Sequence, residues 1–268
     1  MENMHRREFL ARSIAAAALP AMAGQSLSAS ARSRPDYVIF LTDDQRRDFL
    51  SCAGHPVLRT PHIDRLAQEG IRFENAFVTT PICCTSRASI LTGMYARTHG
   101  VHDFSTDMDR DVFQNSYPAL LREAGYRICT LGKYGIAQGA TPPEAMGFEP
   151  LPPGDHPYFR AWRGERAHVT RIVTDQAVDF IRAVPSDQPF CLMVHFDAPH
   201  AHDYAVRPYP PEPDLESLYT DAEFEDLPLS DCVFFESQPD FLKNSEGRRR
   251  WGTRFSCRQQ YLENMRDV

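Results

Sequence analysis

Residues 83–93 read Cys-Cys-Thr-Ser-Arg-Ala-Ser-Ile-Leu-Thr-Gly. Ser86 is a residue type that caps helices, so this stretch predicts a helix that begins at Arg87. Cys83 would then lie beside the free backbone N–H groups of the first turn, where anions bind. Arg87, one turn into the helix, adds a permanent fork of donors at the same place. Cys83 is therefore a candidate nucleophile in an anion site; the alternative is that Cys83 and Cys84 are buried core residues.

The same stretch resembles the sulfatase signature, in which the cysteine of Cys-X-(Pro/Ala)-Ser-Arg is oxidised to formylglycine after translation. Cys83, Ser86 and Arg87 stand at the positions of that pattern, and so does the Leu-Thr-Gly turn at 91–93. Thr85 departs from it, because it occupies the Pro/Ala place that maturation enzymes read. The resemblance implies formylglycine derived from Cys83, a formylglycine-generating partner enzyme, and hydrolysis of sulfate esters.

Residues 36–42 form a short apolar run, which predicts a strand buried on both faces. The run ends in Asp43-Asp44, and ligands of open α/β sheets lie beyond the carboxyl ends of strands. Two adjacent carboxylates repel unless a cation lies between them. An Asp-rich capping turn is the alternative, but the sulfatase resemblance implies a calcium ion held by Asp43, Asp44 and the modified Cys83.

Two further blocks look like the sulfatase scaffold. Residues 61–70 predict a helix with Thr60 as its cap, followed by a strand at 71–75, and they leave His62 on the surface. Residues 116–125 predict another helix and 126–131 a strand. Lys133 follows that strand, where its ammonium can hold a sulfate oxygen. Gly135 stands where the family usually has a histidine, so one stabiliser of the nucleophile is missing or comes from elsewhere.

A last helix and strand are predicted at 170–184 and 190–196. The strand leads to Ala-Pro-His, and the resemblance assigns His200 to sulfate contact or to protonation of the leaving group. His195 lies inside the strand and is interpreted as structural. His202 is a weaker candidate in the following loop.

The N-terminus predicts export. Arg6-Arg7 precede Phe-Leu, a modest apolar stretch and an Ala-Ser-Ala cleavage site at 29–31. Residues 1–31 are therefore interpreted as a twin-arginine signal peptide, which places the mature protein in the periplasm or outside the cell. The apolar stretch is shorter than the roughly 20 residues of a membrane span, so no stable span is expected.

Composition excludes some functions. The chain has 268 residues, a net charge of -7 and no basic groove, which argues against nucleic-acid binding. Its seven cysteines include no CxxC pair, so neither a zinc site nor a defined disulfide pattern is supported. Residues 199–240 are rich in proline and acid, and they either shape the substrate pocket or form an exposed connection. The arginine cluster at 248–250 is interpreted as solvated surface.

The expected fold is α/β: a mixed, largely parallel sheet flanked by helices, resembling the alkaline phosphatase superfamily. Residues 32–268 correspond to the N-terminal part of the sulfatase catalytic domain. The family's later strand and calcium ligands have no counterpart after the helix predicted at 255–268, so the C-terminal part of the fold is missing. Two carboxylates and one hydrate oxygen fall short of the ~6–8 oxygens that calcium prefers.

Three hypotheses remain. The first is a sulfatase that acts on a sulfated small molecule or, by preference, a sulfated carbohydrate, with Cys83, Arg87, Lys133 and His200 as catalytic residues. The second is a phosphate ester hydrolase of the same superfamily, which Cys83 disfavours because such phosphatases usually use serine or threonine. The third is an inactive truncated chain that binds anions, which Thr85, Gly135 and the abrupt end favour.

Overall fold

The computed structural model describes residues 34–137, 144–154, 156–203, 205–225 and 232–267. The predicted signal peptide therefore lies outside the described residues. Within them, no helix has both the length and the apolar character needed to cross a membrane.

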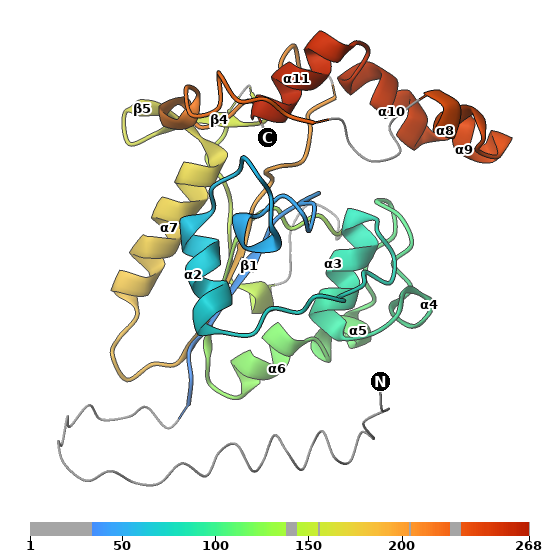
Figure 1. The fold of residues 1–268 in the computed structure, drawn as a ribbon. Coiled ribbons are helices and arrows are strands. Elements are labelled where there is room, and N and C mark those ends of the chain that lie inside the picture. Colours follow the sequence, from blue (N-terminus) through green and yellow to red (C-terminus); the bar gives the residue numbers. More distant parts are fainter. Residues whose placement is uncertain (1–33, 138–143, 155, 204, 226–231, 268) are drawn as a thin grey trace, which may run out of the picture. The chain divides into compact units, whose positions relative to one another are not determined.

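A four-stranded parallel sheet organises the described chain, in the order β1-β6-β2-β3. A separate antiparallel pair joins β4 to β5, and both of these strands are labelled in Figure 1. The strands are β1 (Tyr37–Leu41), β2 (Arg127–Gly132), β3 (Phe148–Glu149), β4 (Phe159–Trp162), β5 (Glu165–His168) and β6 (Phe190–His195). The longer helices are α2 (Pro61–Glu69), α3 (Cys83–Thr92), α6 (Tyr117–Glu123), α7 (Val169–Ala183), α10 (Glu246–Arg254) and α11 (Arg258–Asp267). The shorter ones are α4 (Ala96–His99), α5 (Arg110–Gln114), α8 (Cys232–Glu236) and α9 (Asp240–Lys243), and three 3-10 turns, η1 to η3, lie at Ser51–Ala53, Glu144–Met146 and Pro213–Leu215.

The central strand β6 is buried along its whole length, and its alternate side chains enter two different cores. Cys191 and Met193 pack with residues of α3 and α6. Leu192 and Val194 pack with residues of α7. Because helices cover both faces, a continuous apolar run is the expected sequence of this strand. The α/β class with a parallel sheet flanked by helices is thereby confirmed.

The edge strand β1 differs from the prediction. Its run of apolar residues predicts burial on both faces, but Val38 and Phe40 are 44% and 60% exposed. Within the described residues, β1 pairs only with β6. An apolar sequence shows that a strand can be buried, but the burial that it reaches depends on which other segments of the chain pack against it.

The strand predicted at 71–75 is wrong, because the described chain has no strand there. Ile71 and Phe73 are 83% and 78% exposed, so these alternating apolar side chains do not pack against a sheet. The preceding helix is as predicted, with Pro61 at its first turn, and His62 is exposed.

Helix α7 begins directly after β5, and His168 caps it. The Thr170 N–H donates to Nδ1 of His168 at 3.2 Å, and Nε2 faces the carbonyl oxygen of Pro210 at 3.1 Å. His168 is 3% exposed. This buried ring therefore ties the start of α7 to the proline-rich segment that follows β6.

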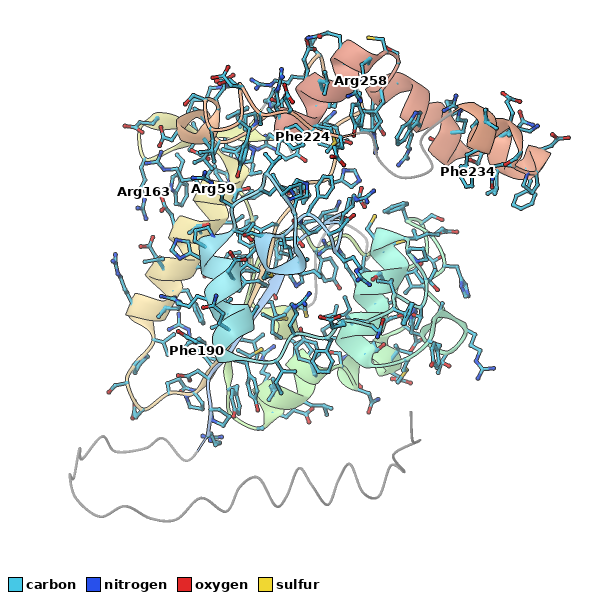
Figure 2. The ribbon with its side chains drawn as sticks, viewed as in Figure 1. Arg59, Arg163, Phe190, Phe224, Phe234 and Arg258 are labelled. Carbon is cyan, nitrogen blue, oxygen red and sulfur yellow. The ribbon has the colours of Figure 1, made fainter. Side chains whose placement is uncertain are left out.

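The C-terminal helices are joined to the earlier chain by a small apolar cluster. Tyr261 and Met265 of α11 pack with Phe49 and Phe224. The Arg258 guanidinium donates to the Phe224 carbonyl at 3.4 Å, and both residues are labelled in Figure 2. Helix α11 is thus held by side chains from two distant segments.

Candidate active site

Polar side chains gather beyond the carboxyl ends of three neighbouring strands. Asp43 follows β1, Lys133 follows β2, and Asp197 and His200 follow β6. Cys83 opens α3 and lines the same pocket as Lys133 and His200. The predicted residues therefore meet at one edge of the sheet, which is where open α/β folds place ligands.

Asp43 is the electrostatic centre of this group. Its carboxylate lies 2.5 Å from Nζ of Lys133 and 3.4 Å from a guanidinium nitrogen of Arg87. Burial alone would raise the pKa of Asp43, but the hydrogen bond and charge of Lys133, together with the charge of Arg87, outweigh it and lower the pKa. Two cations are thus held at the sheet edge by one buried anion.

Cys83 is the first residue of α3, and this corrects the predicted capping. Ile82, with extended backbone angles, occupies the cap position, and Ser86 lies inside the first turn. The Ser86 N–H donates to the Ile82 carbonyl at 2.8 Å, so it is the N–H groups of residues 83–85 that have no partner within the helix. Cys83 consequently lies at the helix N-terminus itself, where developing negative charge is stabilised.

Exposure separates Cys83 from the other cysteines of the sheet region. It is partly exposed and lines the pocket, whereas Cys84 is fully buried in the core. Burial raises the pKa of the Cys129 thiol to about 12 and that of Cys191 to about 11. Among these four, Cys83 alone is placed to meet a ligand.

His200 is held by backbone contacts on both sides. Its N–H donates to the Asp197 carbonyl at 2.9 Å, and its own carbonyl accepts a hydrogen bond from the Tyr158 hydroxyl. Nε2 lies 3.7 Å from the carboxylate of Asp44, a residue with φ of 60°. The ring is thereby positioned over the pocket beside a carboxylate.

His195 has a different role, in agreement with its structural interpretation. It is 3% exposed, and Nδ1 donates to the Lys133 carbonyl at 3.1 Å. Arg87 donates to the same carbonyl at 2.7 Å. Both contacts fix the backbone that carries Lys133.

Asp197 is a site residue that the sequence reasoning missed. It lines the pocket, and burial raises its pKa, with a further upward contribution from Asp43 and opposing ones from Lys133 and Arg87. The available signal was a charged residue directly after a buried strand, two positions beyond His195. A second carboxylate therefore lies close to the Asp43 cluster.

Asp43, Asp44 and Cys83 do not form a ready three-ligand cluster. Within the described ranges, no three His, Cys, Asp or Glu side chains are close enough to hold a metal ion together. The donor type suits calcium, because carboxylate oxygens are its preferred ligands, but calcium would have to replace Lys133 as the partner of the Asp43 carboxylate. Asp43 and Asp44 remain the residues that would hold the ion.

The pocket that contains Cys83 has a volume of about 410 Å³. Its other walls include Phe104, the segment at Pro157 and Tyr158, the loop after β6 with His202 and Asp203, and α10. Arg250 of α10 lines it and lies 3.5 Å from Asp203. All three arginines at 248–250 are exposed, as predicted for a solvated cluster, and Arg250 in addition lines the pocket.

The edge of the parallel sheet thus gathers a helix-terminal cysteine, two cationic side chains and a histidine. Comparison with known proteins specifies the family. The family model described as Sulfatase matches residues 35–265, and the chain belongs to the sulfatase family.

Relatives and solved structures agree with this family. An N-acetylglucosamine-6-O-sulfatase of Bacteroides thetaiotaomicron is 34% identical over 181 residues, which is 62% of this chain and 31% of that protein. An ulvan-active sulfatase of Formosa agariphila is 31% identical over 206 residues, 69% of this chain and 40% of the relative. The chain thus spans less than half the length of either relative.

The fold is similar to that of a protein solved in complex with its substrate D-glucosamine-2-N,6-O-disulfate. That similarity has a TM-score of 0.65 at 24% identity and covers 87% of this chain and 58% of the other. A putative sulfatase from Bacteroides fragilis gives a TM-score of 0.58 at 22% identity, and the match covers 94% of this chain and 59% of the other. Both comparisons support an α/β fold of the sulfatase type.

Gly135 is required by its surroundings. Its φ is 73°, and a Cβ at this position would lie 2.9 Å from Cδ of Arg87. We expect Gly135→Ala to lower the free energy of unfolding by roughly 2–3 kcal/mol, from backbone strain and displacement of Arg87. Urea titration measures this loss. Gly164→Ala is the matched control, because Gly164 has a φ of 89° but nothing within 4 Å of its Cβ position. An equal loss of stability in both variants would show that contact with Arg87 contributes nothing.

Two buried histidines make stability depend on pH. Burial lowers the pKa of His168 and of His195 to about 4 each, against an unfolded value of about 6.5. The unfolded chain therefore binds more protons between these values, and stability falls as the pH drops from about 6.5 to 4, by up to about 3 kcal/mol per histidine. Urea midpoints at pH 7.5 and pH 5 measure the effect. His62→Gln, at an exposed histidine, should leave the slope unchanged, and a flat profile for the parent protein would contradict the prediction.

Proposed function

We propose that this protein hydrolyses sulfate esters of carbohydrates, with formylglycine derived from Cys83 and with calcium. The observation that carries the proposal is the position of Cys83, at a helix N-terminus inside a sulfatase motif and in one pocket with Lys133 and His200. Relatives named as sulfatases of N-acetylglucosamine and of ulvan support carbohydrate as the substrate class.

In this proposal some site residues bind the sulfate group and others act as nucleophile or proton donor. Oxidised Cys83 would supply a hydrated aldehyde as the nucleophile. Arg87 and Lys133 hold sulfate oxygens and stabilise the charge that develops on them, with the N–H groups at the start of α3. Binding of sulfate requires the Lys133 ammonium to turn from Asp43 toward the ester. Asp43 and Asp44 would hold calcium, which makes the nucleophile more acidic. His200 supplies a proton to the leaving alcohol.

The decisive experiment is the mass of the peptide that contains Cys83. The chain is produced together with a formylglycine-generating enzyme, digested, and compared with the same chain produced without that enzyme. We expect a peptide lighter than the cysteine form, matching an aldehyde, and turnover of a sulfated sugar only in the converted sample. Turnover of phosphate esters by unconverted protein would favour the phosphatase hypothesis, and conversion without any turnover would favour the inactive chain.

A further inference from the structure

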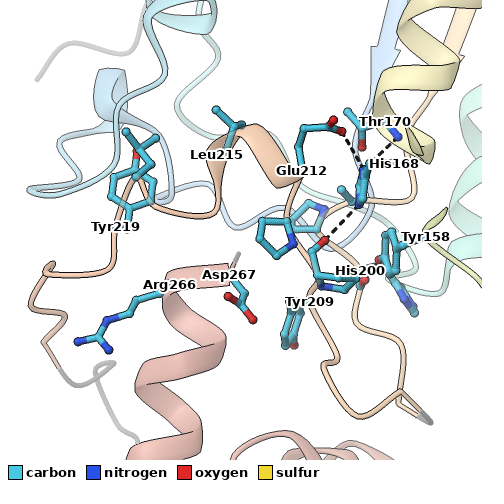
Figure 3. Close-up of a pocket in the computed structure, with 15 residues that line it drawn as sticks. Tyr158, His168, Thr170, His200, Tyr209, Glu212, Leu215, Tyr219, Arg266 and Asp267 are labelled. Carbon is cyan, nitrogen blue, oxygen red and sulfur yellow. Dashed lines mark hydrogen bonds and ion pairs between the residues drawn. The ribbon is translucent and has the colours of Figure 1, made fainter. Parts of the chain in front are cut away.

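A second pocket adjoins the one that contains Cys83. It has a volume of about 210 Å³, and it shares Tyr158 and His200 with its neighbour (Figure 3). Its walls include Tyr209 and Tyr219 and the prolines Pro210 and Pro211. This size is below the ~300–1,000 Å³ of pockets that hold drug-sized ligands, which suits a single ring better than a chain of rings.

Polar atoms with no hydrogen-bond partner lie around this apolar pocket. Within the described part of the chain, Oγ1 of Thr170, Oε2 of Glu212 and Nε of Arg266 are all buried and make no hydrogen bond. All three residues line the pocket. Buried polar atoms are normally paired, so three exceptions at one cavity indicate a ligand that completes them.

The contacts of His168 show why Glu212 needs such a ligand. Nδ1 of His168 accepts a hydrogen from the Thr170 N–H, so the proton of the neutral ring is on Nε2, which donates to the Pro210 carbonyl. Oε2 of Glu212, 3.9 Å from Nδ1, therefore faces a lone pair and receives no hydrogen from the ring. Figure 3 shows Glu212 and Thr170 on either side of His168.

The chemistry of these groups selects among ligands. Glu212 requires a donor, which a hydroxyl or amine of the ligand supplies. Tyrosine and proline walls suit the C–H faces of a pyranose. A bare aryl ring would offer Oε2 of Glu212 no hydrogen to accept.

We propose that this pocket binds the sugar ring of the sulfate ester, with Glu212 accepting a hydroxyl hydrogen and Thr170 completing the contact. The inference rests on the proposed function, since it places the sugar next to His200 and its sulfate beside Cys83. Glu212 is then a specificity-determining residue for sugars over aryl groups.

Binding of an unsulfated sugar tests this pocket apart from hydrolysis. Methyl N-acetylglucosaminide is titrated into the full chain and followed by saturation-transfer NMR, and circular dichroism checks that each variant is folded. We expect Glu212→Gln and Thr170→Val to weaken binding about tenfold or more. Asp214→Asn is the matched control. Asp214 lies on the same turn and is 83% exposed, and its carboxylate is 3.9 Å from Arg171, which also lies 3.8 Å from Glu212. This substitution should leave sugar binding unchanged.

Kinetics with two substrates separates the two proposals. Glu212→Gln should raise KM for N-acetylglucosamine-6-sulfate about tenfold and lower the ratio of kcat/KM for this sugar sulfate to kcat/KM for 4-nitrophenyl sulfate, whereas Asp214→Asn should leave that ratio unchanged. Hydrolysis of N-acetylglucosamine-6-sulfate that is insensitive to Glu212→Gln would overturn the sugar pocket while the proposed function stands. Sugar binding that depends on Glu212, in a converted chain without any hydrolysis, would support the pocket and overturn the proposed function.

Discussion

Replacing Cys83 by serine is expected to abolish repeated turnover of sulfate esters, with kcat falling by at least about 10³-fold. A serine hydroxyl at the start of α3 keeps the size of the side chain and its place beside Lys133 and Arg87. It cannot become the hydrated aldehyde, whose second hydroxyl releases the bound sulfate. The protein is therefore expected to stop after one turnover at most. Steady-state hydrolysis of 4-nitrophenyl sulfate measures the loss.

Cys84→Ser is the matched control, because the two cysteines are adjacent and differ in environment. Cys84 is fully buried against the core, so its hydroxyl variant is expected to lose roughly 1–2 kcal/mol of stability and to keep its kcat. Normal turnover in Cys83→Ser with loss in Cys84→Ser would place the nucleophile one residue later. If neither substitution had any effect, the inactive-chain hypothesis would be favoured.

Much of the sheet could be predicted because its strands carry local signals. The strand predicted at 190–196 is observed at Phe190–His195, and that predicted at 126–131 at Arg127–Gly132. An apolar run that stops at polar residues also marks the end of a strand, so the positions of Asp43, Lys133 and His200 at one sheet edge followed from sequence. The helix of residues 83–92 was placed four residues late, because Ser86 looks like a cap but the chain already turns at Ile82.

What could not be predicted depends on contacts between distant segments. The exposure of Phe40 depends on which strands adjoin β1 and not on its own sequence. The environment of Glu212 depends on His168, a helix-capping residue more than forty positions earlier whose neutral ring faces the Glu212 carboxylate. Arg250 reaches the pocket through the packing of α10 near Asp203. Sequence patterns predict elements and their ends, whereas pockets arise where loops from different strands meet.

His200→Ala is expected to have an effect that depends on the leaving group. A sugar alcohol is a poor leaving group and needs a proton as the sulfate bond breaks, whereas 4-nitrophenol leaves readily as its anion. General acid catalysis contributes about 10²–10⁴-fold, so kcat for N-acetylglucosamine-6-sulfate should fall by that factor. Hydrolysis of 4-nitrophenyl sulfate should fall by less than about tenfold, because it does not use the lost proton.

His202→Ala is the control that distinguishes these two histidines of one pocket. His202 lines the same cavity from the following loop, so its loss changes the polarity of the pocket without removing the His200 ring beside Asp44. We expect less than a tenfold change with either substrate. Equal losses on both substrates in His200→Ala would mean that the ring binds sulfate rather than protonates the alcohol. If His202→Ala lowered kcat for the sugar sulfate alone, His202 would be the general acid in place of His200. Only the residue that donates the proton should show an effect that depends on the leaving group.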